Sequence, residues 1–195
     1  MGKERIAAFT DAVLAIIMTI LILELEKPNP LSVRGLWDLR ENFFSYTLSF
    51  FWLGLMWLTH HNSWTLVKKI SNSTVVYTLI LLFFSSFFPY TTSIVSANFN
   101  SKTAQVMYGI IVIAVTLSNI LISKSLDKVN PHVKFGLLYS TSNTITIIDL
   151  IIKVAGLLIA ITVFPAAMSY AIFIDIAVMS FSFWWLERRK EQGLT

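Results

Sequence analysis

The run IAAFTDAVLAIIMTILILEL, residues 6–25, decides the fold class of this chain. Its length is that of the roughly 20 apolar residues that an α-helix needs to cross the hydrocarbon core of a bilayer. Asp11 interrupts the run, and no small-residue cleavage site follows it before Pro28. The run is therefore predicted to be a membrane-spanning helix that stops before Pro28, and not a cleaved signal peptide.

The rest of the chain has the same apolar character. Of its 195 residues, 55% are hydrophobic and only 13% are charged, and the mean hydropathy is +0.70. Soluble domains carry about 25% charged residues, so a bilayer must be the solvent. Five further apolar runs are predicted to span the membrane: Phe43–His60, Val75–Val95 with a kink at Pro89, Ala104–Ile122, Ile145–Phe164 and Ala166–Leu186. We therefore expect an all-α membrane protein, a single domain over residues 1–195, with six transmembrane helices per subunit.

The basic residues predict the orientation. If the N-terminus is inside, ten of the fifteen Lys and Arg residues lie in inside segments, four lie outside, and Lys153 lies within a span. This bias favours N- and C-termini that are both cytoplasmic. The net charge of +4 is thus interpreted as a topology signal, and no nucleic-acid partner is expected. The chain has no cysteine and no hydrolase motif, so we expect neither an enzyme nor a cofactor.

The first predicted helix carries polar groups among apolar ones. Arg5 and Asp11 are ionisable, and such groups inside a membrane usually face protein or water. They lie about 120° apart on the helix, so we expect each to find partners on other helices. One stripe of this helix is formed by Arg5, Phe9, Ala12, Ile16, Ile20 and Leu23, with Thr19 at its border. From spacing alone, a lipid-facing stripe is the simpler interpretation.

Three short motifs occur in order along the N-terminal half. They are Arg5-Ile-Ala-Ala-Phe9-Thr10-Asp11, then Trp57-Leu-Thr-His60-His61 at the end of the second span, then Ser86-Phe-Phe-Pro89-Tyr90-Thr91 in the third. Together they resemble the transmembrane protein 175 family, the endolysosomal potassium channels, whose members open with Arg, three residues and Phe-Ser-Asp. Thr10 keeps a hydroxyl where that family has Ser. The C-terminal half matches the family only in its hydropathy.

The resemblance implies a prokaryotic, single-repeat member in the plasma membrane, with four copies assembled as a homotetramer. Such a protein is a potassium-favouring cation channel whose pore is lined by the first helix of each subunit. By position, Ile16 matches the pore-constricting isoleucine, Thr19 matches the threonine tied to potassium preference, and Ile20 and Leu23 would form further apolar rings. Potassium would be held only transiently. The resemblance also implies an interhelical network of the signature residues Arg5, Phe9, Thr10, Asp11, Trp57, His60 and His61.

Three more charges lie in the last two predicted spans. Asp149 and Lys153 are four residues apart, and Lys153 and Asp175 lie roughly 18 and 15 Å from the turn at Pro165 at 1.5 Å per residue. They are therefore predicted to reach a similar depth. The simpler interpretation is an ion pair that fixes helix register. The alternative is a proton- or ion-coupled secondary transporter that uses Asp149, Lys153 and Asp175.

Overall fold

The computed structural model describes residues 2–138 and 143–191, and the regular elements of these residues are all helices. Residue 1, residues 139–142 and the last four residues of the predicted 1–195 domain lie outside the described residues. In chain order the helices are α1 (Lys3–Ile20), the 3-10 turn η1 (Leu21–Glu24), α2 (Val33–Asp38), α3 (Arg40–Trp64), α4 (Asn72–Ser85), α5 (Phe88–Ala97), α6 (Lys102–Val129), α7 (Asn143–Thr162) and α8 (Ala167–Glu191).

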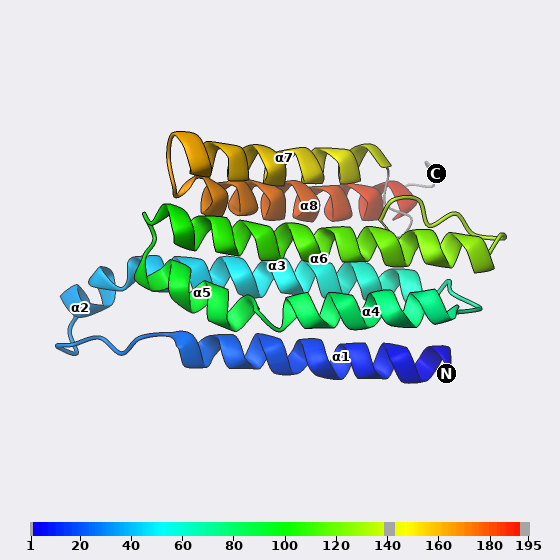
Figure 1. Cartoon of the computed structure of the whole chain (residues 1–195), viewed down its shortest axis with the longest axis horizontal. Coiled ribbons are helices and arrows are strands. Elements are labelled where there is room, and N and C mark those ends of the chain that lie inside the picture. Colours follow the sequence, from blue (N-terminus) through cyan, green and yellow to red (C-terminus); the bar gives the residue numbers. More distant parts are fainter. Residues whose placement is uncertain (1, 139–142, 192–195) are drawn as a thin grey trace.

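The long helices run side by side as one bundle (Figure 1). α1 lies at one edge and packs against α3, α4 and α5, while α7 lies at the opposite edge against α8 and α6. The N-terminus, the α3–α4 connection, the end of α6 and the end of α8 all lie at the same end of the bundle. The start of α1 and the end of α8 therefore share one side. That this side is the cytoplasm stays a prediction.

Five helical segments among the described residues are long and apolar enough to cross a membrane, namely 3–24, 72–97, 102–129, 143–162 and 167–185. The chain is therefore an integral membrane protein. The remaining predicted span, Phe43–His60, lies within α3, which at 25 residues extends about 37 Å. Its buried side includes the polar residues Asn42, Ser45, Ser49 and Thr59 among apolar ones, and these lower its hydropathy. The count of six spans thus stays a prediction.

Pro89 breaks the helix outright instead of kinking it. α4 ends at Ser85, and α5 starts at Phe88 with Pro89 in its first turn, where the missing N–H of proline costs no intrahelical hydrogen bond. Hydroxyls beside the break bond to nearby carbonyls: Ser86 Oγ donates to Phe83 O at 2.7 Å, and Thr91 Oγ1 donates to Phe87 O at 3.0 Å. Phe88 is fully buried and stacks on Trp52, which anchors the break in the core.

Candidate functional site

α1 has one covered face and one open face. Ile6, Thr10, Leu14, Ile17 and Leu21 recur every three or four residues and are buried against the bundle. Thr10 adds no unpaired hydroxyl to that face, because its Oγ1 donates to Ile6 O at 2.8 Å. This spacing fixes the rotation of α1 about its axis, so the opposite side of the helix points away from the rest of the subunit.

The open face of α1 is the stripe that the sequence predicts. All of its members, Arg5, Phe9, Ala12, Ile16, Thr19, Ile20 and Leu23, are exposed in the subunit. The exposed fraction is 58% for Ile16 and 77% for Leu23. Thr19 Oγ1 donates to Ile16 O at 2.8 Å, so its hydrogen is used within the helix and its lone pairs remain available as acceptors.

The signature residues divide between three environments. Asp11 accepts a 2.8 Å hydrogen bond from Trp57 Nε1 on α3, and the ring of Trp57 stacks on that of His61 at 5.2 Å. His60 is buried, with its ring 4.8 Å from that of Trp64. Arg5 and Phe9 instead belong to the open stripe. The geometry therefore joins Asp11, Trp57 and His61, and it does not gather all seven residues into one network.

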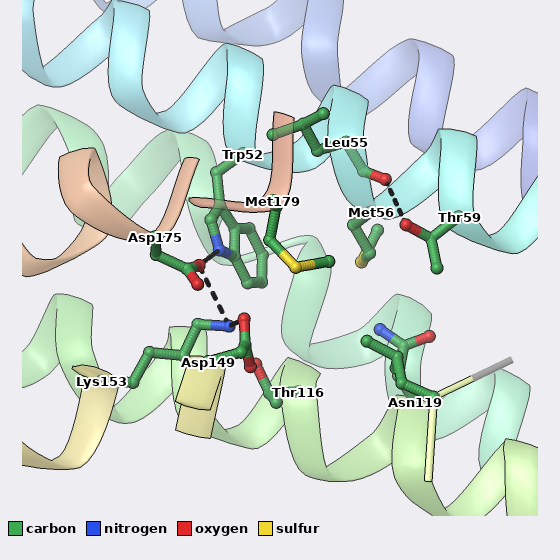
Figure 2. Close-up of a pocket in the computed structure, with 11 residues that line it drawn as sticks. Trp52, Leu55, Met56, Thr59, Thr116, Asn119, Asp149, Lys153, Asp175 and Met179 are labelled. Carbon is green, nitrogen blue, oxygen red and sulfur yellow. Dashed lines mark hydrogen bonds and ion pairs between the residues drawn. The ribbon is translucent and has the colours of Figure 1, made fainter. Parts of the chain in front are cut away.

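A second polar site lies inside the subunit, between α3, α7 and α8. Lys153 bonds Asp149 Oδ1 one turn earlier on α7, and its Nζ lies 3.2 Å from Asp175 Oδ2 on α8. Trp52 Nε1 on α3 also donates to Asp175 Oδ2, at 3.1 Å, and the ammonium lies over the Trp52 ring (Figure 2). The three charged side chains are at most 4% exposed. We call Asp149, Lys153 and Asp175 the charged cluster.

Trp52 is the member of this site that the sequence did not single out. A tryptophan in an apolar span is usually interpreted as core or as an interfacial anchor. Trp52 could have been predicted from its position three residues after Ser49, on the side of the helix that carries polar residues. An indole N–H buried there needs an acceptor.

A small cavity adjoins the charged cluster. It measures about 40 Å³, which exceeds the roughly 10–15 Å³ that a cavity needs in order to hold a water molecule. Its lining combines the cluster with residues of α3, α6 and α8 and with Leu138: Trp52, Leu55, Met56, Thr59, Thr116, Asn119, Leu138 and Met179. The α1 stripe is not part of this cavity. The subunit thus has two separate candidate sites.

Comparison with known proteins bears on the first of these sites. The family model described as "Endosomal/lysosomal potassium channel TMEM175" matches residues 5–89. The resemblance to the TMEM175 family is confirmed. The TMEM175 match contains the open stripe of α1 and the Asp11–Trp57 contact, whereas the charged cluster lies beyond its end.

Individual TMEM175 relatives agree with this match. A potassium channel of Chryseobacterium sp. (strain P1-3) is 37% identical over 110 residues, which cover 56% of this chain and 57% of the relative. A potassium channel of Streptomyces collinus is 27% identical over 122 residues, or 58% and 59% of the two chains. The endosomal/lysosomal proton channel TMEM175 of Rattus norvegicus is 31% identical over 96 residues, or 43% and 19%. The matches thus span less than two thirds of each relative.

The fold extends this likeness over nearly the whole chain. The crystal structure of a TMEM175 homolog from Chamaesiphon minutus, described as a lysosomal potassium-selective channel, superposes with a TM-score of 0.69. It covers 92% of this chain and 97% of its own, at 19% identity. At that identity the superposition shows a shared fold. The shared fold therefore includes the C-terminal helices, where the sequence resembles the TMEM175 family only in its hydropathy.

Proposed function

We propose that this chain is the subunit of a passive, potassium-favouring cation channel whose pore is lined by the first helices of several copies. The observation that carries the proposal is the open stripe of α1, which the subunit's own helices leave uncovered along the length of the helix. The stripe lies within the part of the chain that matches a potassium-channel family. Two bacterial relatives, each matching more than half of this chain, are named as potassium channels.

The side chains of the stripe suit a gated cation path. Four copies of Ile16 around one axis would make an apolar ring that closes a pore by excluding water. Ile20 and Leu23, one and two turns further on, would repeat that ring. Thr19 lies between Ile16 and Ile20 along the helix, and the lone pairs of its hydroxyl can meet a partly dehydrated cation. Such weak contacts at several depths permit conduction, because an ion that is bound lightly can leave again.

The rest of the proposal follows the TMEM175 likeness. It is a homotetramer in a prokaryotic plasma membrane, with six spans per subunit and both termini in the cytoplasm. The arrangement of the bundle supports it, because the start of α1, the end of α8 and the α3–α4 connection with its lysines lie at one end. The partners are potassium ions and the bilayer.

Potassium flux from liposomes tests the proposal. The purified chain is reconstituted and compared with Ile16→Asn, which places an amide in the proposed ring and should raise the flux by letting water and ions wet the constriction. Ile151→Asn is the matched control. Ile151 is 59% exposed, almost the same as Ile16, but it lies on α7 at the far edge of the bundle. Its substitution should leave flux at the wild-type value.

The outcomes separate pore-facing from lipid-facing exposure. A rise for Ile16→Asn alone supports a ring on the axis. Equal effects of the two substitutions would mean that both isoleucines face lipid, and the pore assignment would then be wrong. No flux from any of the three folded, oligomeric proteins would refute the channel.

A second candidate is a proton- or ion-coupled transporter built on the charged cluster. The observation that favours it is the burial of Asp149, Lys153 and Asp175 beside a cavity, since ionisable groups in such positions often mark ion or proton pathways. This candidate requires saturable flux that Asp175→Asn abolishes and Ile16→Asn leaves unchanged. The channel instead requires flux that Ile16→Asn changes and Asp175→Asn does not abolish.

A further inference from the structure

The charged cluster is not electrically balanced. It combines the carboxylates of Asp149 and Asp175 with the single ammonium of Lys153, which amounts to one excess negative charge if all three groups are ionised. Water screens little of that charge, because each side chain is at most 4% exposed. An uncompensated charge in such surroundings is strongly destabilising, so buried clusters are normally neutral.

Among the described residues that line the neighbouring cavity, none supplies the missing positive charge. α3 and α6 contribute Trp52, Thr59, Thr116 and Asn119 to the cavity beside the cluster, and the described lining of that cavity contains no ionisable group besides the cluster itself. Lys153 already contacts both carboxyl groups. The Trp52 N–H is a neutral donor that bonds Asp175 Oδ2 without changing the charge.

Two carboxylate oxygens remain to be satisfied. Asp149 Oδ2 and Asp175 Oδ1 are fully buried and accept no hydrogen bond from any residue that the structure describes. Both carboxyl groups contact the same ammonium, that of Lys153, and both line the cavity (Figure 2). Two ionised carboxylates have no hydrogen to share. One bound proton would supply a donor and would also make the cluster neutral.

We propose that the charged cluster is a proton-binding site, in which one proton is held between Asp149 and Asp175 while Lys153 stays charged. A hydronium ion gives the proton to one carboxyl oxygen, so that an O–H bond of hydronium breaks, a carboxyl O–H bond forms and a water molecule is left; release is the reverse step and returns a carboxylate and a hydronium ion. This site would be separate from the α1 stripe. The proposal holds whether or not the chain conducts potassium.

The cavity explains how such a proton can exchange. Thr59 Oγ1 donates to Leu55 O at 2.8 Å and Thr116 Oγ1 donates to Val112 O at 3.0 Å, so both hydroxyl oxygens keep lone pairs as acceptors. These oxygens, the carboxyl groups and a few waters can form a hydrogen-bonded chain in a space of about 40 Å³.

A proton fits the site better than an alkali cation does. A metal ion in this space would need several oxygen ligands in place of its water shell. Much of the lining is apolar, with Leu55, Met56, Leu138 and Met179, and the ammonium of Lys153 already lies between the carboxylates and would repel the ion.

Infrared spectroscopy of the purified full-length chain tests the proposal, because a protonated carboxylic acid has a carbonyl band that a carboxylate lacks. At neutral pH the wild type should show this band, shifted by exchange into D₂O. Asp149→Asn and Asp175→Asn should each abolish it, since either leaves one carboxylate balanced by Lys153. The matched control is Asp38→Asn, in which an exposed carboxylate is replaced and the band should remain.

Three results would overturn the proposal. One is a wild-type spectrum without an acid band, which by itself is decisive even if a variant fails to fold. Another is a band that survives both substitutions in folded protein, which would place the proton elsewhere. The third is a melting temperature raised by potassium or sodium chloride in the wild type but not in Asp175→Asn, without an acid band, which would identify an alkali-cation site.

Discussion

Several polar side chains in this bundle pair across helices, and each pairing fixes a position along the helix axes. Asp11 on α1 meets Trp57 on α3, Ser49 on α3 contacts both Thr92 and Tyr108, and Lys153 on α7 meets Asp175 on α8. Apolar contacts in a membrane give little preference for one register, because lipid is as apolar as leucine. These few polar contacts therefore specify how the helices are aligned.

Trp57→Phe should lower the stability of the α1–α3 contact. The substitution removes the indole N–H that bonds Asp11 Oδ1 at 2.8 Å but keeps a ring against His61. We expect the free energy of unfolding to fall by about 1–1.5 kcal/mol. This is at the lower end for a hydrogen bond to a charged acceptor, because the contact is only partly buried. Unfolding in detergent by chemical denaturant measures it.

Two further variants decide whether that hydrogen bond is the cause. Asp11→Asn keeps an acceptor oxygen and should lose less stability than Trp57→Phe does. Trp37→Phe makes the same chemical change on α2, at a side chain that is 68% exposed, and should have no effect. A loss for Trp37→Phe as large as that for Trp57→Phe would contradict this assignment.

At the residue scale, spacing predicted some contacts and not others. The helical rise and the turn at Pro165 were enough to expect Asp149, Lys153 and Asp175 at one depth, because both separations run along regular helices. The Trp57–Asp11 and Trp52–Asp175 contacts join helices far apart in sequence. They depend on how the helices rotate against each other, which no local spacing encodes.

At the scale of elements, α7 and α8 approach closely because small residues face each other. A Cβ on Gly156 would come within 2.3 Å of Ala171 Cβ, a separation that real Cβ atoms do not reach. Gly156 and Ala160 are four residues apart on the buried side of α7, which is the small-xxx-small pattern of close membrane helix pairs. This approach is what allows Lys153 and Asp175 to touch.

Gly156→Ala should therefore force α7 and α8 apart and destabilise the fold by about 1–3 kcal/mol, as overpacking does. Adding Ala171→Gly removes the clashing methyl and should restore much of the loss. Gly54→Ala on α3 is the control, because its Cβ would meet only Met18 Cε at an ordinary 3.6 Å. Thermal unfolding of the four proteins tests this, and equal losses for Gly54→Ala and Gly156→Ala would exclude the clash as the cause.

Element boundaries followed from the sequence where local chemistry decides them. Because proline lacks an N–H, Pro28 predicted the end of the first helix and Pro89 predicted a disruption within the third span. The full break at Ser86 and Phe87 was not predicted, since it depends on the burial of Phe88 against Trp52. The polar residues on the buried side of α3 also lower the hydropathy of that helix, although Asn42 and Ser49 find hydrogen-bond partners on α5.

For the whole molecule, the basic residues between the spans predicted that the first and last helices have their outer ends on one side, and the start of α1 and the end of α8 do lie at the same end of the bundle. What surrounds each face of the bundle could not be predicted in this way. An exposed isoleucine in one subunit looks the same whether it faces lipid or another copy, because both environments are apolar. Only the TMEM175 resemblance distinguishes the α1 stripe from the outer face of α7.

Cross-linking of single cysteines tests that distinction in the assembled protein. The chain has no cysteine of its own, so Ile16→Cys and Ile151→Cys each introduce the only thiol. A disulfide requires Cα atoms within about 7 Å, which copies of Ile16 reach only when first helices converge on an axis. We therefore expect oxidation in the membrane to link Ile16→Cys subunits into dimers at a rate that Ile151→Cys, equally exposed but on α7, does not approach. If Ile151→Cys links as fast, or Ile16→Cys does not link at all while both proteins are oligomeric, α1 does not line the axis, and α7 or another helix must be tested as the pore lining instead.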